Sequence, residues 1–243
     1  MNLYRDRIYN NYVHARHQAL APDSVVGLAP RAAYLRRLVR RHFPQDHNAR
    51  ILDLGCGHGA ILHFAREAGY TDIRGVDGSP EQVAAARKLG IAGVEEGNIH
   101  DMLASVTDAS IDVIITFDVI EHFTRDELIP LVDSIYRVLK SGGSWLIHVP
   151  NGESPFGGRI RYGDFTHELA FTRTSLGQLL FSSGFSGEES FEDTPVPHGI
   201  KSTVRAILWW AIRCVLLAYT VIETGTFDKK AIFTQNFLTV AVK

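Results

Sequence analysis

The sequence predicts an α/β fold, in which helices cover both faces of a parallel β-sheet. From residue 50 onward, short apolar segments alternate with amphipathic segments of helical period, a pattern typical of alternating strands and helices. The chain has 243 residues, 45% hydrophobic and 21% charged, which is ordinary for one globular domain with or without an added element. Two cysteines are too few for a disulfide scaffold.

Five apolar segments in the first two thirds of the chain are expected to be strands. They are rich in Ile, Leu and Val, and Gly, Asp or Asn residues follow several of them. The segments are residues 51–54, 73–77, 91–96, 111–117 and 144–149. Their apolar residues follow one another without regular alternation, which indicates strands that are covered on both faces.

Helices are expected between these strands and on both sides of them. The expected helices are residues 29–43, 60–68, 80–89, 125–140 and 172–183. Thr124 and Glu127 fit a capping box at the start of the fourth. Pro130 predicts a kink or a tight first turn in it.

The regular alternation of expected strands and helices stops after Pro150. Residues 151–170 form a polar loop rich in Gly, Arg, Asp and His, and two further strands are expected at 185–191 and 232–242. An apolar helix around 206–222 lies between these two strands, so we interpret it as an insertion.

Charge is distributed unevenly along the chain. Residues 1–50 hold nine Lys and Arg against three Asp and Glu, whereas residues 51–130 hold five against fourteen. The first segment suits an anionic partner and the second suits a cation. The net charge of −2 excludes a globally basic nucleic-acid binder.

A glycine-rich loop follows the first expected strand. Gly55, Gly57 and Ala60 satisfy the loose pattern G-x-G-x-x-G/A, in which a ligand approaches the backbone at the start of a helix. A purely structural turn fits the same pattern. Asp53 discriminates between ligands, because a carboxylate here repels a pyrophosphate and suits an ammonium group or another cation.

Short polar residues follow three more expected strands. Asp77 ends the second strand, where an acid can accept hydrogen bonds from both ribose hydroxyls of an NAD or an adenosyl ligand. Asn98 follows the third strand, where an amide can pair with adenine. Asp118 follows the fourth strand, and Glu121 and His122 come next. Because such strand ends line the crevice of an open α/β sheet, we expect a ligand there.

Four segments at these strand ends and a fifth segment before the last of the five strands form one set. They are DLGCGHG at 53–59, GVDGS at 75–79, GNI at 97–99, FDVIEH at 117–122 and VLKSGG at 138–143. The set resembles the motifs of the class I S-adenosylmethionine-dependent methyltransferases, over about residues 48–150. The resemblance implies a Rossmann-like sheet of seven strands, mostly parallel, with an antiparallel last strand that matches 232–242.

The resemblance also implies roles for the motifs, with S-adenosylmethionine as the cofactor. The glycine loop would hold its methionine portion, Asp77 its ribose, and Asn98 with Ile99 its adenine. Many members carry Asp at the position of Asn98, and an amide can still pair with adenine. The implied cofactor-binding residues are Asp53, Gly55, Cys56, Gly57, Gly59, Asp77, Gly78, Asn98, Ile99, Asp118 and Val119.

The predicted organisation has an N-terminal helical cap, residues 1–47, and a methyltransferase domain, residues 48–243. Within that domain, 151–172 would be the acceptor loop and 197–226 the apolar helical insertion. In this family the N-terminal segment often folds over the cofactor. Tyr12 or Arg16 is therefore a candidate to close the site, with core packing as the other role for the tyrosine.

Catalytic candidates come from the loop after the fifth strand. A hydroxyl acceptor must lose its proton, which a His or a carboxylate beyond the methyl group can take. Segments between 161 and 185, beginning with RYGDFTHE, resemble a branch common among bacterial polysaccharide and sugar methyltransferases. Under this resemblance His167 is the candidate general base, with Asp164 orienting it or binding a sugar hydroxyl.

Other roles remain open for the residues expected near the acceptor. Asp164 and His167 also suit turn hydrogen bonds within the loop. His148 is a second candidate base. Glu121 and His122 fit either direct chemistry or a structural corner beneath the cofactor. No paired-ligand spacing indicates a metal site, so none is predicted.

Residues 206–222 approach a membrane span in hydropathy, but Arg213 in their interior argues against one. On a helix, Lys201, Arg205 and Arg213 share one flank, and apolar residues cover the rest. Such a helix can lie in a membrane interface with its cations toward headgroups, contact a second subunit of a homodimer, or pack on the sheet. The absence of a secretory pattern favours the cytoplasm, at the inner face of the membrane in the first case.

The sequence therefore predicts an S-adenosylmethionine-dependent O-methyltransferase that acts on a sugar or a lipid-linked glycan. One alternative is O-methylation of a quinone-precursor phenol or another small molecule at the membrane. Another is a non-catalytic scaffold that binds S-adenosylmethionine. Nucleic acid is not an expected partner, because the basic N-terminal segment supplies no aromatic stacking platform.

Overall fold

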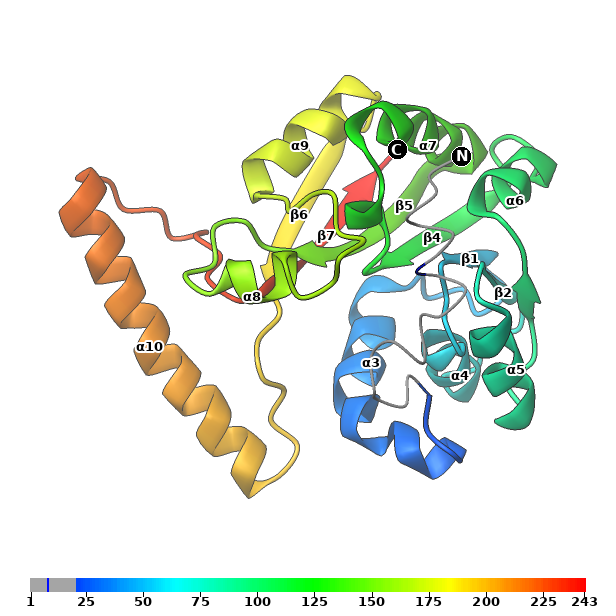
Figure 1. The fold of residues 1–243 in the computed structure, drawn as a ribbon, viewed down its shortest axis with the longest axis horizontal. Helices are drawn as coiled ribbons and strands as arrows, with labels where there is room; N and C mark the ends of the chain where they lie inside the picture. The colour runs from blue at the N-terminus through cyan, green and yellow to red at the C-terminus, as the bar shows by residue number, and fades with distance from the viewer. Residues whose placement is uncertain (1–7, 9–20) are drawn as a thin grey trace.

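The computed structural model describes residues 8 and 21–243 (Figure 1). Its strands are β1 Ile51–Leu54, β2 Ile73–Asp77, β3 Val94–Glu96, β4 Ile111–Phe117, β5 Leu139–Pro150, β6 Gly187–Glu192 and β7 Asn236–Val242. Tyr12 and Arg16, the candidates to close the site, lie outside the described residues, as do the other residues of 1–7 and 9–20 in the predicted cap.

Eight α-helices and two 3-10 helices accompany these strands in the described part of the chain. The α-helices are α3 Ala29–His42, α4 Ala60–Glu67, α5 Pro80–Lys88, α6 Ile99–Ser105, α7 Arg125–Val138, α8 Gly157–Arg161, α9 Arg173–Ser182 and α10 Ile200–Thr224. The 3-10 helices are η1 Val25–Leu28 and η2 Ile120–His122. Thr124 and Glu127 form the predicted capping box of α7.

All seven strands form one sheet in the order β3-β2-β1-β4-β5-β7-β6. β1 to β5 pair in parallel, and β7 runs antiparallel between β5 and β6. The predicted mostly parallel, seven-stranded sheet with an antiparallel last strand is confirmed. Because β1 to β4 are parallel neighbours, the four polar strand ends of the sequence analysis meet at one edge.

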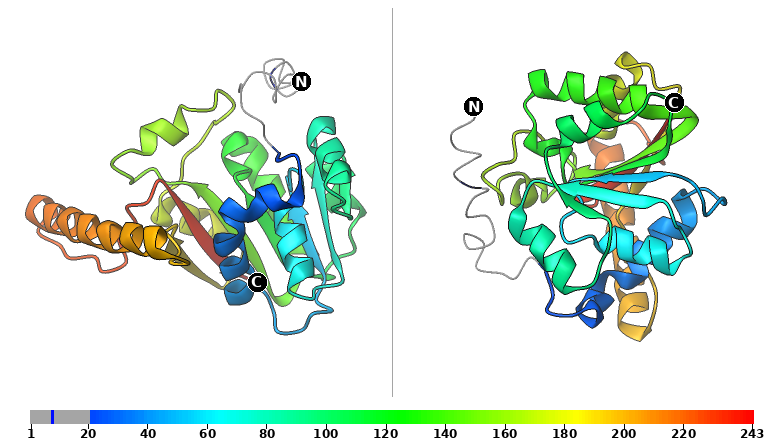
Figure 2. Two further views of the ribbon diagram at one scale, coloured as in Figure 1. Left: turned by 90° about the horizontal axis from the view of Figure 1, so that it is seen from below. Right: turned by 90° about the vertical axis from the view of Figure 1, so that its right-hand side faces the viewer.

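Helices cover both faces of this sheet, because successive residues of a strand point to opposite faces. Val113 and Ile115 of β4 belong to the core formed with α3, α4 and α5. Ile114 between them belongs to the core formed with α6, α7 and α9. The right-hand view of Figure 2 shows the sheet between these two helical layers.

Several boundaries differ from the expected ones. β3 begins at Val94, opposite Gly75, because Ile91 is buried in the α3–α5 core and Gly93 has a φ of +77°. α7 ends at Val138, and the residues expected to finish it begin β5. α6 was not predicted at all, although the Asn98 side chain caps it by accepting a hydrogen bond from the His100 amide at 2.7 Å.

The apolar insertion is a single helix, α10, that projects from the body of the molecule (Figures 1 and 2). By length and composition it could cross a membrane: it has 25 residues, and its most apolar window has a mean hydropathy of 1.6. None of that window is buried within the protein. The alternative that this helix packs on the sheet is therefore wrong.

Candidate active site

The glycine loop between β1 and α4 passes close to the segment after β4. Gly55 and Gly59 have φ angles of +73° and +79°, which favour glycine. A Cβ at Gly55 would lie 2.5 Å from a methyl group of Val119, and one at Gly59 would lie 2.8 Å from Val94. Both positions therefore need glycine for space as well as for conformation, and the close approach brings the ends of β1 and β4 together.

Asp53, the last polar residue of β1, is buried and carries an unsatisfied carboxyl group. Its exposed fraction is 1%, and neither side-chain oxygen has a hydrogen-bond partner among the described residues. Burial, together with the nearby Asp77 carboxylate, raises the pKa of Asp53 to about 8. A buried acid without a partner is unfavourable in its ionised form, so the position suits a cationic ligand group.

Asp77 ties the glycine loop to the end of β2. Its Oδ2 accepts a hydrogen bond from the Gly57 amide at 2.7 Å, and its Oδ1 accepts one from the Ser79 amide at 2.9 Å. These bonds fix the carboxylate at the carboxyl end of its strand. Each carboxylate oxygen can accept a second hydrogen bond, so the structural role does not compete with binding of ribose hydroxyls.

Asn98 and Ile99 mark the start of α6. The Asn98 carbonyl oxygen caps this helix, which leaves its amide group to face a ligand as a donor. Gly78 lies beside them, since a Cβ there would be 3.8 Å from the Gly97 carbonyl oxygen. The predicted adenine-binding residues therefore share one neighbourhood at the end of β3.

A cavity of about 130 Å³ opens between the glycine loop and α3. Its lining residues are Arg31, Leu35, Asp53, Gly55, Cys56, Gly57, Ala60, Ile61, Phe117 and Asp118. Arg31 was not predicted as a site residue; its guanidinium lies over the Phe117 ring, 5.1 Å from the centroid. The cavity thus combines a buried acid with an arginine, which matches the ammonium and carboxylate groups of an amino acid.

His148, the second candidate base, is buried between two carboxylates. Its Nδ1 lies 2.6 Å from Asp118 Oδ1, and its Nε2 lies 3.5 Å from Asp193 Oδ2. Burial lowers the pKa of an imidazole, but the two carboxylates outweigh it and raise the pKa of His148 to about 10. The ring stacks on Phe117 with centroids 3.8 Å apart. A ring that already holds its proton favours a positioning role toward Asp118 over proton abstraction.

Asp118 has an unusual backbone for a non-glycine residue, with a φ of +57°. This left-handed conformation turns the chain sharply after β4, and the ion pair with His148 supports it. Burial raises the pKa of Asp118, but the charge of His148 lowers it by a larger amount. The net pKa of Asp118 is therefore below its ordinary value. The carboxylate is therefore ionised at the edge of the cavity.

His167 and Asp164 meet the residues after β4. His167 Nε2 lies 3.9 Å from Glu121 Oε1, and the His122 and His167 rings stand 4.7 Å apart in an edge-on arrangement. Asp164 Oδ1 accepts hydrogen bonds from the amide and hydroxyl of Thr166, and that hydroxyl contacts His122 Nδ1. Through Thr166, Asp164 therefore orients His122.

Burial also sets the ionisation of the two residues after Ile120. It raises the pKa of the Glu121 carboxyl group well above the ordinary value, and Asp118 raises it further. Burial, together with His167, lowers the pKa of His122 to about 4. The sequence left direct chemistry and a structural corner beneath the cofactor open for this pair, and in the structure Glu121 is buried whereas His122 is half-buried.

Comparison with known proteins agrees with this geometry. Residues 28–190, more than half of the chain, match the family described as "Methyltransferase domain". A probable S-adenosylmethionine-dependent methyltransferase of Mycolicibacterium smegmatis is 29% identical over 156 residues, which cover 64% of this chain and 57% of that protein. Ajmaline N-methyltransferase of Rauvolfia serpentina is 30% identical over 172 residues, covering 63% and 55%.

The chain thus spans little more than half the length of these two relatives. The crystal structure of a SAM-dependent methyltransferase from Archaeoglobus fulgidus superposes with a TM-score of 0.66 at 21% identity, over 90% of this chain and all of that one. The resemblance to class I enzymes is confirmed, although nothing in these matches favours the polysaccharide branch. The chain belongs to the methyltransferase-domain family, and its fold is that of the S-adenosylmethionine-dependent methyltransferases.

Proposed function

We propose that this methyltransferase modifies a hydroxyl group of a sugar, carried on a lipid-linked glycan. The observation that carries the hydroxyl acceptor is the meeting of Glu121, His122 and His167 where loop 151–172 crosses the end of β4. A hydroxyl must lose its proton as it is methylated, and this cluster offers proton-accepting atoms. The lipid-linked carrier rests on α10, argued below.

For the cofactor, the proposal assigns the ends of the amino-acid portion to two cavity residues. Asp53 pairs with the ammonium group, because it is buried and has no other hydrogen-bond partner among the described residues. Arg31, which also lines the cavity, pairs with the carboxylate. Asp77 binds the ribose, Asn98 and Ile99 bind the adenine, and Gly55, Gly57 and Gly59 let the ligand approach the loop.

The bound cofactor supplies a methyl group on a sulfonium, and the pair of electrons in the broken C–S bond stays on sulfur. The acceptor oxygen forms the new O–C bond with its lone pair, and its proton passes to His167 Nε2. The Nδ1 atom of His167 lies 3.0 Å from the Ile160 carbonyl oxygen and donates to it, so Nε2 is the basic atom. The protein's main contribution is to align oxygen and methyl group.

An acceptor screen tests this function. Methyl-labelled S-adenosylmethionine is incubated with the full chain and with sugar nucleotides, polyprenyl-phosphate-linked glycans, polyprenyl phenols or small amines. Label in a glycan as an alkali-stable methyl ether supports the proposal. Transfer only to phenols or to amines would replace the acceptor class, and cofactor binding without transfer to any class would favour the scaffold alternative.

Cofactor affinity should rise with pH up to about 8. Below its pKa of about 8, the Asp53 carboxyl group of the free protein is protonated, and pairing with an ammonium group requires its ionisation. Binding therefore releases a proton, and affinity increases by up to about tenfold per pH unit below 8. Titration calorimetry with S-adenosylhomocysteine, in buffers of different ionisation enthalpy, measures this proton. Proton uptake, or an affinity independent of pH, would contradict the assignment.

The topology around α10 favours a helix that lies in a membrane interface over one that spans it. Residues 193–199 lead into α10 from β6, and residues 225–235 return to β7, the direct neighbour of β6 in the sheet. A spanning helix would force 225–235 to recross the bilayer as a non-helical segment that contains Asp228, Lys229 and Lys230. Unpaired backbone groups make such a crossing unfavourable.

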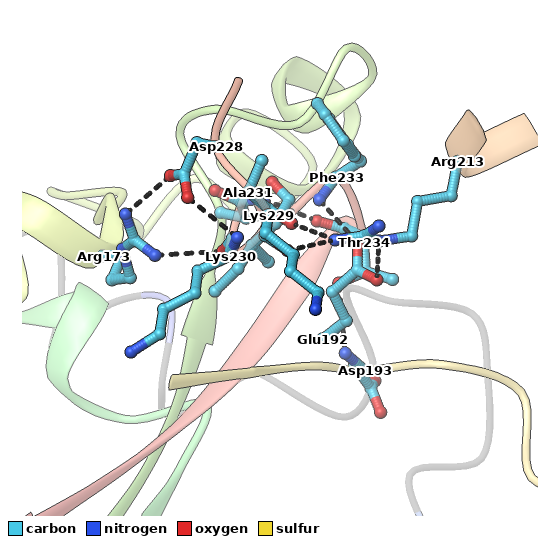
Figure 3. A network of polar contacts seen from close by, with 12 residues as sticks. Arg173, Glu192, Asp193, Arg213, Asp228, Lys229, Lys230, Ala231, Phe233 and Thr234 are labelled. Atoms are coloured by element: carbon cyan, nitrogen blue, oxygen red, sulfur yellow. Dashed lines mark hydrogen bonds and ion pairs between the residues drawn. The ribbon is translucent and has the colours of Figure 1, made fainter. Parts of the chain in front are cut away.

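Arg213, the charge that interrupts the apolar stretch, faces the protein. Its Nε lies 2.8 Å from Glu192 Oε2, and its Nη2 donates to the carbonyl oxygens of Lys229 and Ala231 (Figure 3). In the membrane-interface alternative the cations of this flank would point toward lipid headgroups, and Arg213 does not, because it binds Glu192 and two backbone carbonyl groups. With Arg213 neutralised on the inner flank, the outer face of the helix carries no charge between Ala206 and Ile222.

That outer face is apolar and exposed over its whole length. Its exposed large side chains are Ile200, Val204, Ile207, Leu208, Trp210, Ile212, Val215, Tyr219 and Ile222. Beside the helix, a groove of about 630 Å³ is lined by the cations Arg37, Arg41, Arg173, Arg213, Lys229 and Lys230 and by Glu188, Glu189 and Glu192. An apolar helix beside a mainly cationic groove suits a surface of anionic lipid.

Trp210→Glu should weaken binding to phosphatidylcholine–phosphatidylglycerol vesicles by at least tenfold. Trp210 is 67% exposed, and its transfer into the membrane interface is favourable by about 2 kcal/mol. A glutamate side chain at this position does not gain this free energy. Phe181→Glu, at an apolar position on α9 that is 83% exposed, is the matched control and should not change binding. Vesicle flotation measures both. Absence of binding by the wild type, with a dimer that Trp210→Glu dissociates, would assign the helix to a subunit interface instead.

A further inference from the structure

One acid in the acceptor cluster, Glu121, lacks hydrogen bonds to its carboxylate among the described residues, and His167 Nε2 lies 3.9 Å from it. Glu121 is fully buried. Its backbone oxygen accepts hydrogen bonds from the amides of Glu168 and Leu169, which fixes the residue against the acceptor loop but leaves its side chain unsatisfied. An ionised carboxylate in such a place needs a cation.

Two imidazoles complete the cluster. One ligand-type atom from each of Glu121, His122 and His167 lies within 4.8 Å of the other two, a spacing that one metal ion can bridge. The three residues come from η2, at the carboxyl end of β4, and from the loop after α8. Because they converge from two separate segments, no ligand spacing along the chain indicates the cluster, and the expectation of no metal rests on that spacing alone.

Hydrogen bonds hold both rings in the orientation that metal ligation uses. His167 Nδ1 donates to the Ile160 carbonyl oxygen at 3.0 Å. His122 Nδ1 lies 2.9 Å from the Thr166 hydroxyl, which itself donates to Asp164 at 2.6 Å and so accepts from the ring. In both rings Nε2 then carries the lone pair. Histidines that bind metals are held by such outer partners on their other nitrogen.

We propose that Glu121, His122 and His167 bind one divalent transition-metal ion beside the methyl-transfer site. Two imidazoles and a carboxylate suit Zn²⁺, Mn²⁺ or Co²⁺ better than Mg²⁺. Three protein ligands leave coordination positions open, as in catalytic rather than structural sites. The open positions suit an oxygen of the acceptor.

This inference rests on the proposed hydroxyl acceptor. It changes one step of the proposed reaction, the removal of the acceptor's proton. A divalent ion lowers the pKa of a hydroxyl that it ligates, so the acceptor can lose its proton to solvent. The oxygen lone pair still forms the O–CH₃ bond, and the electrons of the C–S bond still pass to sulfur. His167 is then a ligand of the ion and no longer the proton acceptor.

Direct metal binding provides the test. The untagged full chain is treated with a chelator and titrated with Zn²⁺ by calorimetry, and with Mn²⁺ by electron paramagnetic resonance. The wild type should bind one ion, and Glu121→Gln and His167→Gln should each weaken binding at least 100-fold. Asp53→Asn, which changes a buried acid of the cofactor cavity, is the matched control and should retain metal affinity. S-adenosylhomocysteine binding is measured on all four proteins.

The outcomes separate this inference from the proposed function. Stoichiometric binding that both cluster variants lose supports the site. No binding by the wild type, or binding that both variants keep, overturns it. If Glu121→Gln does not fold, His167→Gln decides, because that residue lies on a loop. Intact S-adenosylhomocysteine binding without metal would refute only the ion, whereas metal binding without S-adenosylhomocysteine binding would refute the cofactor assignments.

Discussion

Asp53→Asn should weaken the binding of S-adenosylhomocysteine about 100-fold. The substitution keeps the shape of the side chain but removes the charge that pairs with the ligand's ammonium group. A hydrogen bond to a charged group contributes up to about 3 kcal/mol, and the loss of that amount corresponds to a factor of about 100. Titration calorimetry at pH 8 measures the affinity, because this pH is close to the pKa of Asp53 and its carboxyl group ionises readily there.

Asp72→Asn is the matched control for this variant. Asp72 lies just before β2, where it forms an exposed ion pair with Arg50 at 3.2 Å, and it does not line the cavity. Exposed pairs contribute little to stability, so this variant should bind the ligand like the wild type. An unchanged affinity in Asp53→Asn would contradict the role given to the buried carboxylate.

His167→Ala should lower kcat by a factor of 10² to 10⁴ while leaving cofactor affinity unchanged. A positioned proton acceptor contributes about this much to a reaction, and loss of a metal ligand would have an effect at least as large. Single-turnover transfer to the acceptor found in the screen measures the chemical step. His198→Ala, at an exposed histidine that lies before α10, is the control.

Two readings of a defective His167→Ala variant can be separated by its metal content. If His167 acts only as a base, chelator-treated wild type keeps its activity, and the variant fails in the presence or absence of Zn²⁺. If His167 is a ligand, chelation of the wild type reproduces the defect of the variant. An active His167→Ala would contradict both roles and leave the residue with its loop hydrogen bonds.

The succession of strands along the chain could be predicted because several local signals agree. Apolar runs such as 111–117 are too short for helices and end in turn residues, and the resemblance supplied the antiparallel last strand. Boundaries were less predictable where tertiary packing decides them. Ile91 has the residue type of a strand, yet it is buried beneath helices, and Leu139 follows a helical period but pairs with Ile111.

The cofactor residues could be predicted because they are close together in the chain and follow strand ends. Arg31 could not be predicted as a cofactor residue. It is one of five arginines on a helix, and such a set is typical of a helix face exposed to solvent. Only the packing of α3 against β4 brings it over Phe117 and into the cavity.

On the acceptor side, the polar residues could be predicted but their contacts could not. His167, Asp164 and His148 were recognisable as polar residues, but their partners depend on the fold. His148 gains its second carboxylate from Asp193, which lies after β6. Glu121 is a buried acid whose carboxylate has no hydrogen-bond partner among the described residues, and the amides of Glu168 and Leu169, distant in sequence, bind its backbone oxygen.

The most direct test of the account compares two ligands on two proteins. S-adenosylhomocysteine carries the amino-acid portion, and 5′-methylthioadenosine lacks it. Wild type should bind the first far more tightly, Asp53→Asn should lose most of that preference, and both proteins should bind methylthioadenosine equally. If Asp53→Asn weakens the two ligands to the same extent, the buried carboxylate serves the stability of the loop, and its pairing with the cofactor is refuted.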